Sequence, residues 1–161
     1  MSKFRSAPAS YEGAPVAYTD SACFRNGRRN ARAGYGVYWD DNYFGLDDVS
    51  ERLHGRATNQ RAELMAVHNA IQQAIDYGYP RMIIRTDSTY VVNSLVFWIR
   101  NWRHNDWIND NGNPVSNQSL IRDIDNLLDD IWVWFEHVCA HSGDHGNEEA
   151  DRLANKGANG C

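Results

Sequence analysis

Two short apolar segments of the chain end in the same three residues, Thr-Asp-Ser. Residues 15–21 carry Asp20, and residues 82–88 carry Asp87. Segments of this composition predict β-strands, each delivering its carboxylate to the C-terminal end of the strand. If the strands lie side by side, the two carboxylates repel each other unless a proton or a cation lies between them. The spacing therefore predicts a metal site at the ends of these strands.

Composition limits the classes of protein that this chain can belong to. Its 161 residues are 42% hydrophobic and 23% charged, which is typical of one globular domain with its own core. The net charge of −5 argues against binding nucleic acid by bulk attraction, although a locally basic groove remains compatible with it. The 3 cysteines are widely spaced, which favours a reducing compartment over a disulfide framework. No run approaches ~18 apolar residues, so no membrane-spanning helix is predicted.

The chain termini are expected to be tails around a single domain. Residues 1–14 lack the apolar core of a signal peptide and are predicted to be disordered, although Lys3 and Arg5 also fit the remnant of a transit peptide. The domain is expected over residues 15–158, and residues 159–161 form a second tail. We expect an intracellular protein of the nucleus or cytoplasm, with the mitochondrion as an alternative.

The first half of the chain predicts three antiparallel strands followed by a helix. Residues 34–39 and 43–46 are expected to pair with the strand at 15–21, since short connections imply antiparallel neighbours. After Thr58, apolar residues recur at helical spacing until Gly78 and Pro80 end the pattern. Glu63 is expected in the first turn of this helix, where the helix dipole favours a carboxylate.

The second half of the chain predicts alternating helices and strands. The strand ending at Asp87 is followed by helical patterns over residues 91–99 and 120–128, with an irregular segment between them. Residues 131–138 are apolar on both faces, as expected of a buried strand. Asn147 is expected to cap the last helix. The whole predicts an α/β fold with one mixed five-stranded sheet, three strands antiparallel and then two parallel, flanked by helices.

Four acids thus fall at the ends of predicted elements, in segments that together resemble one family. The residues that carry the resemblance are Tyr18-Thr19-Asp20, Thr58-Asn59-Gln60-Arg61-Ala62-Glu63, Thr86-Asp87-Ser88, His141-Ser142-Gly143 and Gly146-Asn147-Glu148-Glu149-Ala150-Asp151. They are similar to ribonuclease H, in particular to the cellular, eukaryotic-like type 1 branch. The resemblance covers nearly all of residues 15–158.

The resemblance implies a chemistry that agrees with the acids. It implies an endoribonuclease that cuts the RNA strand of RNA/DNA hybrids, with Asp20, Glu63, Asp87 and Asp151 as ligands of two Mg²⁺ ions, for which Mn²⁺ can substitute. Magnesium prefers oxygen ligands, and two metal ions can activate a water and neutralise the leaving oxygen of a phosphodiester. The resemblance also implies that His141 assists proton transfer or product release. A rival interpretation, a zinc cluster of His137, Cys139, His141 and His145, draws all its ligands from one segment, which is unusual for structural zinc.

The resemblance also implies contacts to the hybrid. Asn26, Asn59 and Gln60 match positions that contact the minor groove and the 2′-hydroxyls, for which amide side chains suit a group that both donates and accepts. Arg56, Thr58 and Asn117 match a phosphate pocket for the DNA strand. Tyr90, Trp98 and Trp102 match a channel along the DNA backbone, although the two tryptophans equally suit core packing.

Three departures from the family pattern affect these expectations. Ser21 and Ala140 each replace a glycine that is common in the family, and residues 100–106 are less basic than the lysine-rich segment of well-known members. We expect a monomer. Two alternatives stay open: the ribonuclease domain of a reverse transcriptase, and a hybrid-binding module without catalysis.

Overall fold

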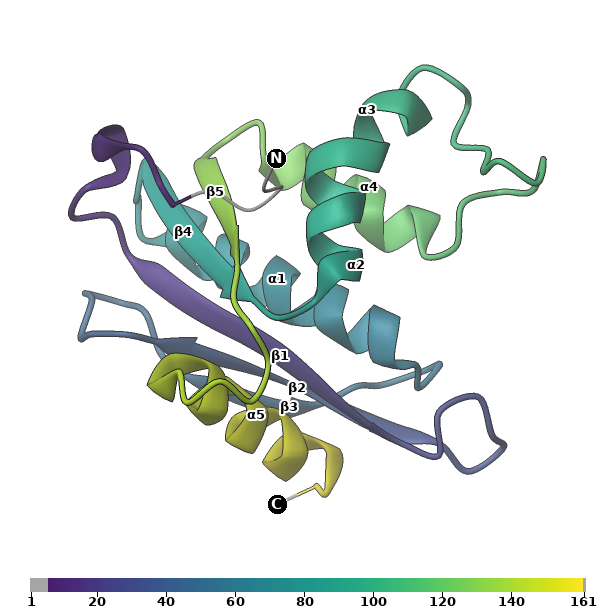
Figure 1. The fold of residues 1–161 in the computed structure, drawn as a ribbon, viewed down its shortest axis with the longest axis horizontal. Helices are drawn as coiled ribbons and strands as arrows, with labels where there is room; N and C mark the ends of the chain where they lie inside the picture. Colours follow the sequence, from purple (N-terminus) through teal and green to yellow (C-terminus); the bar gives the residue numbers. More distant parts are fainter. Residues whose placement is uncertain (1–5, 161) are drawn as a thin grey trace.

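The computed structural model describes residues 6–160, which form one five-stranded sheet with helices on both faces (Figure 1). The strands run in the order β3-β2-β1-β4-β5 across the sheet. Strand β1 pairs antiparallel with β2 and parallel with β4, β2 pairs antiparallel with β3, and β4 pairs parallel with β5. The predicted mixed sheet is therefore confirmed. The strands are β1 (Val16–Phe24), β2 (Arg32–Trp39), β3 (Val49–Arg52), β4 (Arg81–Thr86) and β5 (Trp132–His137).

The helices divide into two layers. One face of the sheet carries a helical layer whose members share one apolar core, and helix α5 packs alone across β1, β2 and β3 on the other face (Figure 1). A continuous helical segment after β4 contains a π-helical stretch, η2. The helical elements are η1 (Ala9–Tyr11), α1 (Asn59–Asp76), α2 (Thr89–Val92), η2 (Asn93–Trp98), α3 (Ile99–Trp102), α4 (Gln118–Leu127) and α5 (His145–Ala158). None of the described helices is long and apolar enough to span a membrane.

Helix α1 forms where the sequence predicts it. The hydroxyl of Thr58 accepts a hydrogen bond from the backbone N–H of Arg61, which caps the helix. Leu64, Val67 and Ile71 are fully buried against the sheet, as their helical spacing requires. Glu63 was expected in the first turn, and this was wrong: the helix begins at Asn59, so Glu63 lies one turn deeper.

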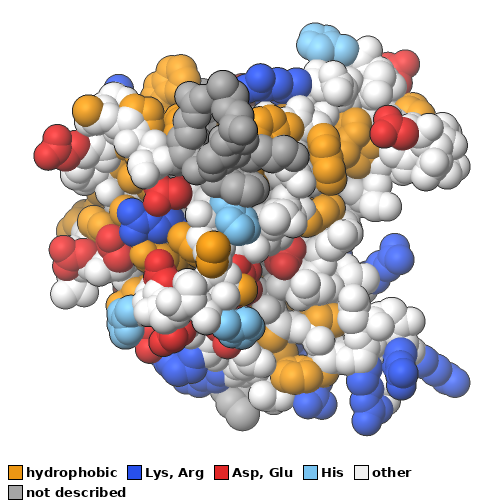
Figure 2. All heavy atoms as spheres, in the orientation of Figure 1, with side chains coloured by type: hydrophobic (Ala, Val, Ile, Leu, Met, Phe, Trp, Pro, Cys, Tyr) orange, Lys and Arg blue, Asp and Glu red, His pale blue; other side chains and the backbone are white. Residues whose placement is uncertain are grey.

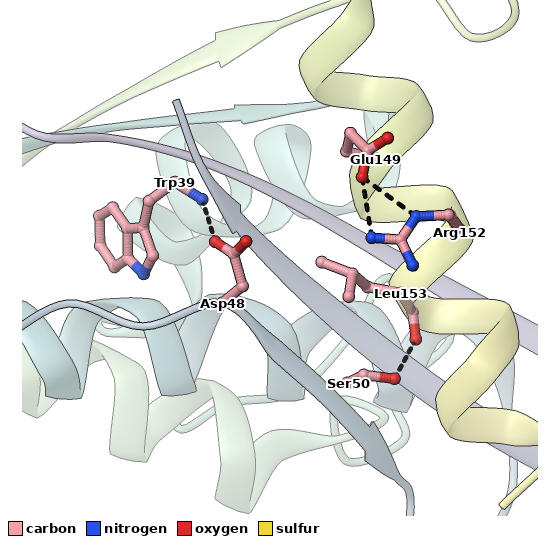
Figure 3. A network of polar contacts seen from close by, with 6 residues as sticks. All are labelled: Trp39, Asp48, Ser50, Glu149, Arg152 and Leu153. Atoms are coloured by element: carbon pink, nitrogen blue, oxygen red, sulfur yellow. Dashed lines mark hydrogen bonds and ion pairs between the residues drawn. The ribbon is translucent and has the colours of Figure 1, made fainter. Parts of the chain in front are cut away.

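Close approach of α5 to the sheet depends on two glycines. A Cβ atom at Gly36 would lie 2.5 Å from the carbonyl oxygen of Ala150, and one at Gly146 would lie 2.2 Å from the Tyr18 ring. Ser50 in β3 adds a hydrogen bond, donating to the carbonyl oxygen of Leu153 at 2.6 Å (Figure 3). Because α5 cannot approach β1 without small residues beneath it, these positions set how deeply Asp151 lies over the sheet.

The third predicted strand was misplaced. Residues 43–46 form a turn, in which Gly45 has φ of 78° and the Tyr43 ring packs edge-on against Trp39. The strand follows later, as β3 at Val49–Arg52. Asp48, just before it, accepts a hydrogen bond from the backbone N–H of Trp39 at 2.9 Å and ties the loop to β2 (Figure 3).

Three other sequence-based predictions need correction. Strand β1 does not stop at Asp20 but continues to Phe24, because its antiparallel pairing with β2 extends beyond the parallel pairing with β4. Strand β5 is half-buried rather than buried, since it lies at the edge of the sheet and Trp132 is 68% exposed. Helix α5 begins at His145 with Asp144 as its N-cap, so Asn147 lies inside the helix.

The predicted tails are described only in part. Residues 1–5 and 161 lie outside the described residues. Within the predicted disordered segment 1–14, residues 9–11 instead form the short helix η1, and the Tyr11 ring packs on Trp134 with 6.0 Å between ring centroids. Asn159 and Gly160 continue from α5 through backbone hydrogen bonds to its last turn.

Candidate active site

A pocket of about 230 Å³, where the parallel pairing of β1 and β4 ends, is lined by all four predicted acids. Its walls come from β1, α1, the turn after β4, the loop after β5 and α5. The lining residues are Asp20, Ser21, Asn59, Glu63, Asp87, His141, Asn147, Glu148 and Asp151. The four carboxylates, far apart in the sequence, therefore converge on one pocket.

Strand register positions Asp20 and Asp87. Thr19 pairs with Thr86 as the last parallel pair between β1 and β4, so the two aspartates follow directly beyond it. Ser88 then begins α2 as its N-cap, with its hydroxyl accepting from the backbone N–H of Val91. The two carboxylates are neighbours because each directly follows the last residue pair of the parallel ladder.

Burial and repulsion make the Asp20 carboxylate difficult to ionise. Asp20 is only 9% exposed. Burial, followed by the negative charge of Asp87 and smaller effects of Asp151 and Glu63, raises the pKa of Asp20 to about 8. A hydrogen bond of 2.8 Å from the backbone N–H of Ser21 opposes this rise but does not cancel it. The pocket thus concentrates negative charge that only a proton or a cation can offset.

Glu63 is held from two sides. The Ser88 hydroxyl donates to one carboxylate oxygen at 2.6 Å, and the Asn59 amide donates to the other at 3.2 Å. Burial raises the pKa of Glu63, while hydrogen bonds from Ser88, Ser21 and Asn59 act in the opposite direction. These donors favour the ionised carboxylate in one fixed orientation.

Helix α5 brings residues to the pocket that sequence reasoning missed. Asn147 and Glu148 line it beside Asp151, which also accepts from the Asn155 amide at 3.2 Å. Asn147 is 5% exposed, and its Oδ1 has no hydrogen-bond partner among the described residues. Helical spacing of three and four residues from Asp151 would have identified both, since such positions share a face.

His141 reaches the pocket from an exposed loop. It has φ of 55°, in the left-handed region, and Gly143 follows with φ of 83°. Its side chain nevertheless lines the carboxylate pocket. The structure therefore brings the predicted histidine and the four acids together.

The predicted substrate residues fall into separate groups. The Asn26 amide oxygen lies 3.4 Å from the backbone N of Asn59, beside the pocket. The Asn117 amide donates to the Tyr90 hydroxyl at 3.3 Å, so these two also meet. Trp98 and Trp102 are in contact, with ring centroids 6.0 Å apart, but they line a different hollow, together with Asn101, Asn105, Asn109, Asp110 and Asn111.

The other predicted substrate residues lie near the start of α1. Thr58 is the N-cap of that helix. Arg56 and Gln60 are exposed, and the backbone carbonyl of Arg56 accepts from the Arg61 guanidinium at 2.9 Å. No described contact joins Arg56 or Thr58 to Asn117, so a single phosphate pocket of these three residues stays a prediction.

Basic side chains gather away from the acids. Arg25, Arg28 and Arg29 are exposed on the loop between β1 and β2, which extends at the lower right in the orientation of Figure 2. Asn26 lies on the same loop. The surface thus places positive charge on one side of the carboxylate pocket, despite the net charge of −5.

Neither metal arrangement is preformed. Within residues 6–160, no three His, Cys, Asp or Glu side chains stand close enough together to hold a metal ion in their present positions. The zinc alternative has a further difficulty, because His145 packs edge-on against Tyr38 and His137 Nε2 lies 3.2 Å from the Asp87 carbonyl oxygen. The four acids line the same pocket, but no three of their side chains lie close enough to share one metal ion.

An α/β domain with a carboxylate pocket at the strand ends defines a class, and comparison with known proteins defines the family. The family model for RNase H matches residues 12–159, so the chain belongs to the RNase H family. It is 42% identical to Ribonuclease H1 of Mus musculus over 150 residues, covering 92% of this chain and 52% of that protein. The predicted resemblance to the eukaryotic-like type 1 branch is therefore confirmed.

Two further similarities agree with membership of the RNase H family. A ribonuclease H of Cyanothece sp. is 36% identical over 139 residues, covering 85% of this chain and 84% of that protein. The foamy viral protease-reverse transcriptase in complex with RNA/DNA hybrid is 25% identical, with a TM-score of 0.75 over 98% of this chain and 21% of that one. The chain spans about half the length of the mammalian relatives that it matches.

Proposed function

We propose that this chain is an endoribonuclease that hydrolyses the RNA strand of RNA/DNA hybrids. The observation that carries the proposal is the convergence of Asp20, Glu63, Asp87 and Asp151 on one pocket, in a chain of the RNase H family. Burying neighbouring carboxylates is energetically unfavourable, so a purely structural role does not explain their presence in one pocket.

The donor set of the pocket fits Mg²⁺. Burial, together with the negative charge of Asp87, raises the pKa of Asp20, and a divalent cation would offset both effects. The unpartnered Oδ1 of buried Asn147 adds a neutral oxygen that can accept from a metal-bound water. Asp20, Glu63, Asp87 and Asp151 would hold two Mg²⁺ ions, and Mn²⁺ can substitute for them because it also takes oxygen ligands.

The reaction is the attack of water on a phosphodiester of the RNA strand. A bond forms between the water oxygen and phosphorus as the bond to O3′ breaks, which leaves a 5′-phosphate and a 3′-hydroxyl. Bound metal ions supply activation of the water and neutralise charge on the leaving oxygen. His141, on its exposed loop, moves a proton to or from the reacting oxygens, and Ser88 and Asn59 keep Glu63 oriented.

The hybrid is positioned by residues around the pocket. Asn26, Asn59 and Gln60 read the 2′-hydroxyls of the RNA, which distinguishes RNA from DNA. Arg56, Thr58 and Asn117 bind a phosphate of the DNA strand, and Tyr90, Trp98 and Trp102 follow its backbone. A monomeric state and an intracellular location, in the nucleus, cytoplasm or mitochondrion, belong to the same proposal.

The reverse-transcriptase alternative is less favoured. Identity to the foamy viral enzyme is 25%, against 42% to mouse Ribonuclease H1. A binding module without catalysis is disfavoured because all four acids are present and face one pocket.

A cleavage assay tests the proposal. The purified chain is incubated with an end-labelled RNA/DNA hybrid, and with DNA and RNA duplexes of the same sequence, in Mg²⁺ or in EDTA. We expect cleavage of the RNA strand of the hybrid only, and only with Mg²⁺. Tight binding of the hybrid without cleavage would favour the non-catalytic module, and comparable cutting of the DNA duplex would overturn the assignment of the 2′-hydroxyl contacts.

A further inference from the structure

The hydroxyl of Ser21, directly after Asp20, contacts a side chain at the start of α1. Successive residues of a strand point to opposite faces of the sheet. Asp20 therefore points toward α5, and Ser21 points toward the start of α1. There Ser21 Oγ lies 2.7 Å from Oδ1 of Asn59.

The hydrogen bonds in this cluster can run in only one direction. The Glu63 carboxylate, when ionised, is an acceptor only, so the group of Asn59 that faces it at 3.2 Å must be the amide nitrogen. The oxygen of the same amide then faces Ser21, and Ser21 must donate. The amide orientation is thus fixed at both ends by its partners.

The same cluster shows how Ser21 differs from Ser88. Ser88 donates directly to Glu63 at 2.6 Å and also caps α2. Ser21 also acts on Glu63, but its contact of 2.7 Å is to Oδ1 of Asn59, the residue whose amide donates to Glu63. With glycine at this position, Asn59 would keep only the Glu63 contact and could rotate about it.

Orientation matters because the amide has two different ends. One N–H of Asn59 is taken by Glu63, and the second N–H of the same nitrogen is left to donate to a ligand in the pocket. The 2′-oxygen of RNA can accept that hydrogen bond, whereas the deoxyribose of DNA has no oxygen there.

We propose that Ser21 is a specificity-determining positioning residue, whose hydroxyl fixes the Asn59 amide as a donor toward the 2′-oxygen of the RNA strand. This inference rests on the proposed function, since it assumes that the pocket receives an RNA/DNA hybrid.

Binding without cleavage tests the proposal. Fluorescence anisotropy in EDTA gives the Kd of Ser21→Ala for a short RNA/DNA hybrid and for a DNA duplex of the same sequence. We expect the hybrid affinity to fall about fivefold, the effect of one hydrogen bond, with the DNA duplex affinity unchanged. Ser21→Thr, which keeps the hydroxyl and suits a strand, should restore the parental ratio.

A double-mutant cycle separates this role from a general structural one. If Ser21 acts through Asn59, Ser21→Ala should have no further effect on hybrid binding in an Asn59→Ala background. Ser50→Ala is the matched control, because it removes another strand hydroxyl that bonds a backbone carbonyl away from the pocket. We expect Ser50→Ala to lower the melting temperature and leave the ratio of hybrid to DNA affinity unchanged. Additive effects in the cycle, or an unchanged ratio for Ser21→Ala, would overturn the inference.

Nuclear magnetic resonance of the free protein tests the contact between Ser21 and Asn59 without any substrate. Its result is therefore independent of whether the chain cleaves the hybrid. In the parent, the two side-chain N–H signals of Asn59 should be well separated and slow to exchange with water. In Ser21→Ala they should move and exchange faster, while those of Asn155 stay unchanged. Unmoved Asn59 signals would refute the contact. Moved signals in a protein that neither prefers nor cleaves the hybrid would support the contact but refute its role in specificity, together with the proposed function.

Discussion

The carboxylate pocket and the protrusion at residues 98–113 are built in opposite ways. In the pocket, strand register and helix packing bring acids from β1, α1, β4 and α5 to one place, and hydrogen bonds hold Glu63 from two sides. The protrusion follows a π-helical stretch and has left-handed backbone at Asp106 and Trp107. Aromatic contacts join its helical start to its loop, with the Trp102 ring 6.0 Å from Trp98 and 6.1 Å from Trp107, and local hydrogen bonds such as that of Asn105 with Ile108 hold the loop.

The difference separates chemistry from binding. The proposed metal ligands are placed by strand register and helix packing, where burial amplifies their interaction. Exposed tryptophan and asparagine side chains on the protrusion offer contacts that require less precision. Substitutions in the pocket are therefore expected to act on turnover, and substitutions in the protrusion on stability or substrate affinity.

The largest effect is expected for Asp87→Asn, which should lower the cleavage rate on the order of a thousandfold. The substitution keeps the shape of the side chain but removes a charge needed to hold the cation. Melting in EDTA should not fall, because repulsion of Asp20 is relieved. Asp123→Asn, an exposed acid on α4, serves as control, and cleavage by Asp87→Asn near the parental rate would remove Asp87 from the site.

His141→Ala should lower kcat on the order of a hundredfold, the smaller end of the range for a proton-transfer group. The Mg²⁺ concentration for half-maximal activity should stay the same, since His141 is not proposed as a ligand. Rates measured across a Mg²⁺ titration check this, with the exposed His104 of the protrusion replaced by Ala as control. A large shift in the Mg²⁺ dependence would add His141 to the ligands.

The two tryptophans of the protrusion should separate stability from binding. Trp102 is half-buried between two other rings, so Trp102→Ala should cost about 2–3 kcal/mol of unfolding free energy. Trp98 is 45% exposed, so Trp98→Ala should cost less than about 1 kcal/mol and instead raise KM. Urea unfolding and steady-state kinetics on both variants measure these effects. Equal losses of stability would mean that Trp98 is part of the core.

Without divalent metal, the free energy of unfolding should depend on pH because of the buried Asp20 carboxyl. The pKa of Asp20 is about 8 in the folded chain, above its ordinary value of 3.8. Between pH 3.8 and pH 8, Asp20 keeps a proton in the folded chain that it loses in the unfolded chain. The stabilisation of the folded chain by this proton is therefore complete below pH 3.8 and disappears as the pH rises through 8. The slope from this one group is at most about 1.4 kcal/mol per pH unit.

Urea unfolding in EDTA between these pH values measures that slope. Asp20→Asn should flatten it, whereas Asp123→Asn should leave it in place. A parental slope in Asp20→Asn would show that another group carries the pH dependence.

The smallest effects concern two arginines near the protrusion. Arg100 and Arg103 are both exposed, but the Arg103 guanidinium forms an ion pair with Asp125, and its Nε lies 3.0 Å from Oδ2 of that residue. Arg100→Ala should therefore flatten the salt dependence of hybrid binding by roughly 0.9, the effect of one phosphate contact. Arg103→Ala should cost about 0.5 kcal/mol of stability and leave that slope unchanged. The opposite pattern would mean that Arg103 leaves Asp125 to bind the hybrid.

Residue patterns predict the pocket well because its acids lie in segments with strong local patterns. Repeated Thr-Asp-Ser steps locate Asp20 and Asp87 at the end of a parallel strand pair, and helical spacing after Thr58 predicts α1 around Glu63. The third strand was misplaced because the segment 43–46 has strand-like composition. Its turn is fixed by Gly45 and by packing of Tyr43 on Trp39, which no local pattern reveals.

By itself the sequence determined the fold class and the position of α1, since each depends on local periodicity and on the order of elements. The resemblance of its motifs to one family identified the four acids. Tertiary structure alone decided that Arg103 is paired with Asp125 and that Ser21 bonds to Asn59. These contacts join residues from separate elements or depend on which helix face meets the sheet. Their direction and distance are set by packing of the whole domain, which is why sequence order does not contain them.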